Sequence, residues 1–130
     1  MTGIPEEFGE LYDAALRLVP KSETPEMTQA VVARASSAKL YCRTISYAVD
    51  QSEWEQAEAA FVSLLAGVND TEITHMVCLW DSGAVDVPSE HLRSLLTDAD
   101  PLNGETLVLV RTANGCGARP IRTMVPPRGR

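Results

Sequence analysis

The sequence is poor in aromatic residues and histidines, and it contains no Cys-x-x-Cys pair. Phe, Trp and Tyr make up 5% of its 130 residues, and there are two histidines and three widely spaced cysteines. The shortage of aromatics removes the stacking surfaces that single-stranded nucleic acid needs. Two histidines leave little room for a histidine-rich metal centre. An odd number of cysteines that are far apart in the sequence is typical of a protein in a reducing compartment, and not of a secreted domain stabilised by disulfides.

Long apolar runs are missing as well. No segment approaches the roughly 18 apolar residues of a membrane span. The first ten residues carry acids where a signal peptide needs positive charge. We therefore expect a cytoplasmic protein without a membrane partner.

Negative charge dominates, but it is unevenly distributed. The formal net charge is −7, which argues against nucleic acid as a partner of the whole domain. Residues 1–100 carry 17 acidic and 6 basic side chains, whereas residues 101–130 carry one acid and five arginines. Such asymmetry is typical of an interaction surface or of two patches that face each other.

The length and the apolar periodicity predict a single α+β domain over residues 1–125, followed by a flexible tail at 126–130. Apolar residues at spacings of three and four predict helices over 5–19 and 25–49. Strand-forming residues within 38–49 leave a strand open there, although we favour helix.

A third helix is expected to begin at the capping box formed by Ser52 and Glu55. The short link before it predicts a tight helical hairpin with the second helix. The spacing of Trp54, Ala57 and Phe61 is similar to the second helix of a tetratricopeptide hairpin. Ordinary hairpin packing is the favoured interpretation.

The rest of the chain alternates between strand and helix signals. We expect a β-hairpin over 73–87, a short helix over 88–96, a central strand over 106–112 and a returning strand over 118–125. The predicted fold is thus an N-terminal layer of three helices packed with a small, mainly antiparallel ββαββ unit.

The segment 73–80 is apolar on both of its strand faces. An antiparallel sheet with one wet face should alternate between apolar and polar residues. Either the domain's own helices cover both faces, or a second copy covers one of them in a homodimer.

Chemical signals are weak. Cys116 lies between two glycines, and a nearby arginine could favour its thiolate, with His75 or His91 as the base. Turn flexibility is the favoured reading, so Cys116, His75 and His91 are only weak catalytic candidates. His75 and Cys78 point to opposite faces of a strand and cannot share a metal ion. We expect no metal or cofactor.

The arginines at 111, 119 and 122 are candidate binding residues. Charge pairing within the chain or between subunits is favoured for Arg111, Arg119 and Arg122. Recognition of an anion and simple solvation stay open.

The third predicted helix carries Glu53, Glu55 and Glu58 without a basic residue to neutralise them. We expect this acidic face to bind a protein partner, as a regulator, an adaptor, or an inhibitor or immunity protein would. The alternative is a small enzyme or anion-binding domain that uses Cys116 or a histidine together with arginines. A cysteine within hydrogen-bond reach of a histidine would favour the enzyme.

Overall fold

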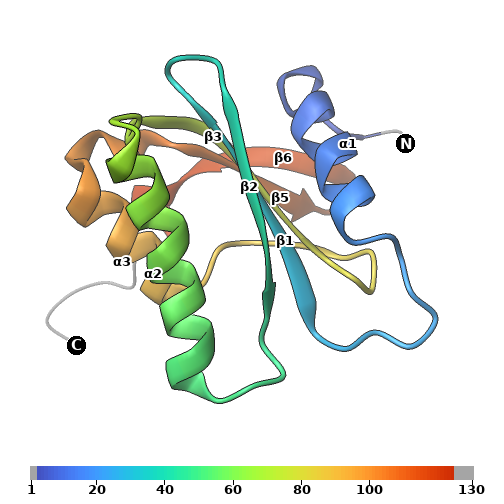
Figure 1. The fold of residues 1–130 in the computed structure, drawn as a ribbon. Helices are drawn as coiled ribbons and strands as arrows, with labels where there is room; N and C mark the ends of the chain where they lie inside the picture. The colour runs from blue at the N-terminus through green and yellow to red at the C-terminus, as the bar shows by residue number, and fades with distance from the viewer. Residues whose placement is uncertain (1–2, 125–130) are drawn as a thin grey trace, which may run out of the picture.

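The computed structural model describes residues 3–124 and combines three α-helices with a six-stranded mixed sheet (Figure 1). The helical elements are η1 (Glu6–Phe8), α1 (Gly9–Leu18), α2 (Gln51–Gly67), α3 (Glu90–Ala99), η2 (Pro101–Glu105) and η3 (Ile121–Thr123). The strands are β1 (Thr28–Ala35), β2 (Leu40–Ser46), β3 (Ile73–Trp80), β4 (Val85–Asp86), β5 (Leu107–Thr112) and β6 (Gly115–Pro120). The predicted tail at 126–130 lies outside the described residues.

The sheet has the order β2-β1-β3-β5-β6, and β4 pairs with β3. All of these pairings are antiparallel except that of β3 with β5, which is parallel and joins His75 to Leu107 and Met76 to Val108. The α+β class and the ββαββ unit are therefore confirmed. The sheet is mixed rather than purely antiparallel, because α3 carries the chain from β3 and β4 to the start of β5.

Helices cover both faces of the sheet (Figure 1). On one face, α2 and α3 pack over a core that contains Met76 and Cys78 of β3. On the other face, α1 packs over a core that contains Val77 and Leu79. The domain's own helices thus explain why β3 is apolar on both sides, while a homodimer stays a prediction. None of the helices in residues 3–124 is long and apolar enough to cross a membrane.

The predicted helix over 25–49 is wrong, because this segment forms the β1–β2 hairpin. Val31 and Val32 belong to a continuous run that is 0% exposed in the middle of the sheet. A strand buried on both faces does not alternate, so its apolar residues fit a helical spacing equally well. The hairpin turns at Ala38, whose φ of 76° lies in the left-handed region.

The expected helical hairpin does not form, since α2 follows β2 and packs against α3. Because that hairpin is absent, the predicted similarity to a tetratricopeptide hairpin does not hold in the structure. The capping box is also wrong, because α2 begins at Gln51 with Asp50 as its N-cap residue and without a side-chain cap. In contrast, Ser89 caps α3 by accepting a hydrogen bond from the backbone N–H of Leu92.

Candidate active site

A buried carboxylate lies where α2 meets α3. Glu58, in the middle of α2, is 0% exposed, and all of the hydrogen-bond donors that reach it come from other elements. Tyr47 Oη and Ser89 Oγ donate to Oε2 at 2.5 and 2.6 Å. His91 Nδ1 lies 2.7 Å from Oε1. Three partners compensate for the loss of water, which a buried carboxylate requires.

The same contacts explain how the N-terminus of α3 is positioned. The Ser89 hydroxyl donates to Glu58 and accepts from the Leu92 N–H at 3.0 Å. A hydroxyl has one donor and two acceptor sites, so it can make both bonds at once. His91 follows on the first turn of α3, so the bond that fixes the start of this helix to Glu58 also brings the His91 ring to the same carboxylate.

Aromatic rings surround this junction. Tyr47 contacts Trp54 and Trp80, with ring centroids 5.2 and 5.4 Å apart. Trp54 contacts the His91 ring edge-on at 6.2 Å. Burial, together with the hydrogen bond to Glu58, raises the pKa of Tyr47 far above its ordinary value. Tyr47 therefore keeps its proton and acts as a donor to Glu58.

The Glu58–His91 pair has the geometry of an acid–base dyad. The His91 side chain is 32% exposed, whereas that of Glu58 is 0% exposed. When Nδ1 carries the proton that Glu58 accepts, Nε2 is left with a free lone pair. Nε2 makes no hydrogen bond to any residue in 3–124. The buried acid can hold the ring while the outer nitrogen exchanges a proton with a substrate or with water.

The weak candidates Cys116 and His75 do not come together. Cys116 is half-buried against the core beneath α1. His75 packs edge-on against Phe8, and its Nδ1 lies 2.9 Å from the Thr74 hydroxyl. Burial and the charge of Arg34 lower the pKa of His75. The cysteine–histidine pair that the enzyme alternative asked for is therefore absent from residues 3–124.

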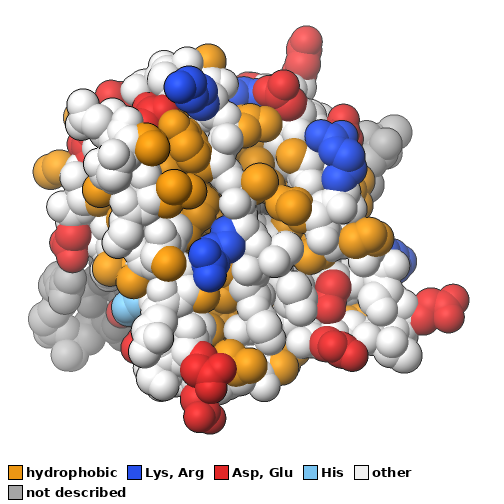
Figure 2. Space-filling model, in the orientation of Figure 1, with side chains coloured by type: hydrophobic (Ala, Val, Ile, Leu, Met, Phe, Trp, Pro, Cys, Tyr) orange, Lys and Arg blue, Asp and Glu red, His pale blue; other side chains and the backbone are white. Residues whose placement is uncertain are grey.

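The three glutamates of α2 do not share one exposed face. Glu53 is exposed, Glu55 is half-buried and accepts a hydrogen bond from the Gln51 amide at 2.9 Å, and Glu58 is buried. On the face that Figure 2 shows, acidic side chains are spread around the rim rather than gathered in one patch. The expectation of an acidic contact face that includes Glu58 is therefore wrong, because Glu58 is buried.

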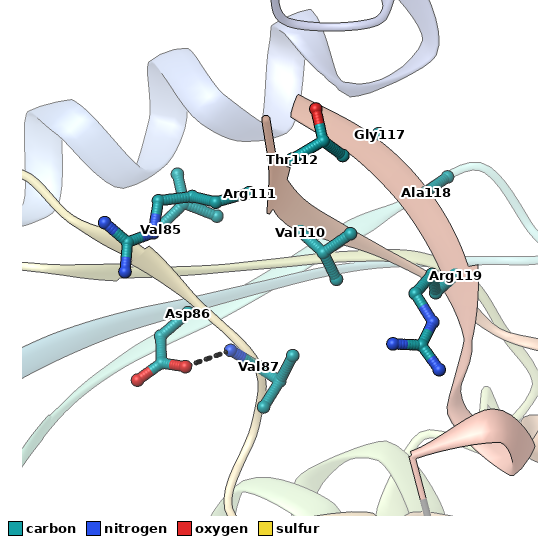
Figure 3. A pocket seen from close by; sticks show the side chains of 9 residues that line it. All are labelled: Val85, Asp86, Val87, Val110, Arg111, Thr112, Gly117, Ala118 and Arg119. Atoms are coloured by element: carbon teal, nitrogen blue, oxygen red, sulfur yellow. Dashed lines mark hydrogen bonds between the residues drawn. The ribbon is translucent and has the colours of Figure 1, made fainter. Parts of the chain in front are cut away.

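The predicted binding arginines separate into two groups. Arg111 and Arg119 line a pocket of about 400 Å³ (Figure 3). Arg122 lies outside it and pairs with Glu105 at 2.8 Å. No ion pair joins these arginines to the acids of α1 or α2 within residues 3–124.

Sequence reasoning missed Tyr47 and Ser89, and it named His91 only as a weak candidate base for Cys116. One signal was available, because Trp54, Glu58, Phe61 and Leu65 follow one another at steps of four, three and four. An acid on the inward stripe of an amphipathic helix needs buried donors. Nothing in the sequence indicates that these donors lie directly after β2, at the N-cap of α3 and on the first turn of α3.

Comparison with known proteins yields a likeness of fold alone. No protein-family description and no curated sequence matches the chain. The solved structure of cytidine deaminase from Mycobacterium leprae has a TM-score of 0.65 at 16% identity, over 95% of this chain and 100% of that one. Cytidine deaminase from Mycobacterium tuberculosis has a TM-score of 0.67 at 15% identity, over 94% of this chain and 96% of that one.

These neighbours correct the predicted function. Both neighbours are cytidine deaminases, which are enzymes, and this contradicts the prediction of a regulatory, adaptor or immunity-like protein. The likeness favours the alternative of a small enzyme.

The chain does not carry the donor set of a zinc deaminase. Such enzymes hold zinc with one histidine or cysteine and two cysteines of a Pro-Cys-x-x-Cys motif. Aligned on Pro88, the two cysteine positions of that motif are Ser89 and Leu92. No group of three or more His, Cys, Asp or Glu side chains in residues 3–124 could hold a metal ion. The residues at this site do not fit zinc.

Proposed function

We propose that the protein is a small enzyme that carries out general acid–base catalysis with its own side chains and without a zinc ion. The observation that supports this most directly is the 2.7 Å contact between the buried Glu58 carboxylate and the partly exposed His91 ring. We also propose the cytoplasm as its compartment, since Cys42, Cys78 and Cys116 are all free thiols.

His91 is the proposed proton carrier. Its Nε2 accepts a proton from a water molecule as that water attacks the substrate, and it returns the proton to the leaving group. Glu58 is a positioning residue that fixes the tautomer through Nδ1 and stabilises the imidazolium. Tyr47 and Ser89 hold the carboxylate through its other oxygen.

The proposed substrate carries a flat heterocyclic ring. Trp54 lies beside His91 and is only half-buried, and stacking of a base on such a ring contributes about 1–3 kcal/mol. The structural neighbours are cytidine deaminases, so pyrimidine nucleosides are the substrate class to test first.

The experiment incubates purified protein with cytidine and a panel of pyrimidine nucleosides, with and without a metal chelator, and follows products by chromatography. We expect turnover that the chelator does not change and that falls at least about 100-fold in His91→Asn. His75→Asn is the matched control, because His75 lies beneath α1 on the other face of the sheet. Turnover that needs added zinc, turnover retained in His91→Asn, or no turnover of any nucleoside would contradict the proposal.

A further inference from the structure

The aromatic rings beside the Glu58–His91 pair are joined to a second carboxylate, on β4. Asp86 Oδ2 accepts a hydrogen bond from Trp80 Nε1 at 2.9 Å. The Trp80 ring meets the Tyr47 ring edge-on at 5.4 Å, and the Tyr47 hydroxyl donates to Glu58. An unbroken series of contacts therefore leads from Asp86 to the carboxylate that binds the His91 ring.

The strand register places this series on the face of the sheet that α2 and α3 cover. Cys78 belongs to the core on that face, and Asp86 is its direct partner across the β3–β4 pair. Trp80 lies two residues after Cys78, so its side chain points the same way. Burial raises the pKa of the Cys78 thiol, and the charges of Asp86 and Glu58 raise it further. Both carboxylates thus act on the same buried thiol.

The Tyr47 and Trp80 rings meet above β1. This strand lies between β2 and β3, while Tyr47 directly follows β2 and Trp80 ends β3. Gln29 of β1 pairs in register with Trp80 and is 2% exposed. Its Oε1 makes no hydrogen bond to any residue in 3–124, so Gln29 does not anchor the Tyr47 hydroxyl. Packing against the two tryptophan rings sets the orientation of the Tyr47 ring.

Asp86 lies at the open side of β4. β4 pairs with β3, and no strand pairing joins β4 to β5 within residues 3–124. The pocket of about 400 Å³ lies between these two strands and has Asp86 in its lining (Figure 3). Asp86 Oδ1 accepts from the Val87 N–H at 2.7 Å, which fixes the carboxylate while Oδ2 holds the indole of Trp80.

We propose that Asp86 and Trp80 are positioning residues for the proton carrier His91. Asp86 fixes the indole of Trp80, and the indole fixes the Tyr47 ring. Tyr47 then keeps its hydrogen bond to Oε2 of Glu58, which leaves Oε1 for His91 Nδ1. That contact selects the tautomer with a free Nε2. The inference rests on the proposed catalytic role of His91, but the tautomer can be measured without any substrate.

The first experiment is nuclear magnetic resonance of the protein with ¹⁵N-labelled histidine, through a pH titration. The shifts of the two ring nitrogens report which one carries the proton, and we expect Nδ1 in neutral His91 of the wild type. Trp80→Phe keeps a ring but removes its N–H donor, and Asp86→Ala removes the acceptor. Each should raise the fraction of the Nε2–H tautomer at least about twofold.

Three further variants test whether the effect passes through the Asp86–Trp80 bond. Asp86→Asn keeps an acceptor oxygen and should retain the wild-type tautomer. The double variant Asp86→Ala with Trp80→Phe should differ from the wild type no more than Trp80→Phe alone does, because both changes remove one bond. Asp98→Ala is the matched control, since Asp98 is an exposed acid of α3 outside the series. Circular dichroism verifies that each variant is folded.

Nucleoside turnover separates this inference from the proposed function. Where the wild type turns over a nucleoside, Trp80→Phe and Asp86→Ala should each lower kcat about fivefold with little change in KM. Where it does not, the proposed function fails, and the tautomer of His91 still decides the positioning role. That role is overturned if wild-type His91 carries its proton on Nε2, or if Trp80→Phe and Asp86→Ala keep the wild-type tautomer. It is also overturned if Asp86→Asn alters the tautomer as much as Asp86→Ala does.

Discussion

Replacement of Glu58 by alanine is the most direct test of the junction between α2 and α3. The substitution removes the acceptor of Tyr47, Ser89 and His91 and leaves a small cavity in its place. A hydrogen bond to a charged group contributes about 1.5–3 kcal/mol. The loss is smaller than three such bonds, because the donors are half-buried and regain water, and because the cost of burying the carboxylate disappears.

We therefore expect Glu58→Ala to lower the free energy of unfolding by about 3 kcal/mol, and to lower Tm by roughly 10 °C. Urea unfolding followed by tryptophan fluorescence measures this, since Trp54 lies in the same cluster. Glu53→Ala is the matched control on the same helix, and its exposed side chain predicts a change within about 0.5 kcal/mol.

Glu58→Gln refines the test. The amide keeps the size of the side chain and accepts hydrogen bonds through one oxygen. We therefore expect its free energy of unfolding to fall by more than in the control Glu53→Ala and by less than in Glu58→Ala. If Glu58→Ala changes stability no more than Glu53→Ala does, the hydrogen-bond network does not hold the two helices together, and the reasoning fails.

Other predictions concern residues outside this cluster. Burial, with Arg34 nearby, lowers the pKa of His75 from its ordinary 6.5, so below that pH the unfolded chain binds more protons and stability should fall with falling pH. Urea unfolding at several pH values should show a smaller fall in His75→Gln than in the wild type, and equal falls would argue against it. Exposed Cys42 should react with a thiol reagent in the native protein, whereas Cys78, whose thiol pKa is raised by burial, should not. Peptide mass spectrometry distinguishes the two, and early labelling of Cys78 would count against a rigid core. Asn103→Ala should lower the free energy of unfolding by about 2–4 kcal/mol, because the buried Asn103 side chain makes three hydrogen bonds to backbone groups. A chemical denaturation curve like that of the wild type would show that water replaces those bonds.

The accuracy of the sequence-based predictions varied with the kind of signal. Three elements were predicted correctly: the helix at 5–19, the hairpin at 73–87 and the helix at 88–96. Each has a clear spacing of apolar residues or is bounded by a glycine or a proline. The segment 25–49 was assigned to a helix, because β1 is buried on both faces and its apolar spacing is ambiguous. Arg111 and Arg119 were recognised as candidates, but their common pocket was not.

The amino-acid sequence by itself determined the α+β class, the two covered faces of β3 and the scarcity of metal-binding residues. These are properties of composition and of local periodicity, which depend on neighbours along the chain. The tertiary structure alone decided that Glu58 meets His91, 33 residues away, and that the sheet opens between β4 and β5. Such contacts depend on tertiary packing. A buried charge must be hydrogen-bonded, and its donors come from segments that are distant in the sequence and share no local sequence pattern.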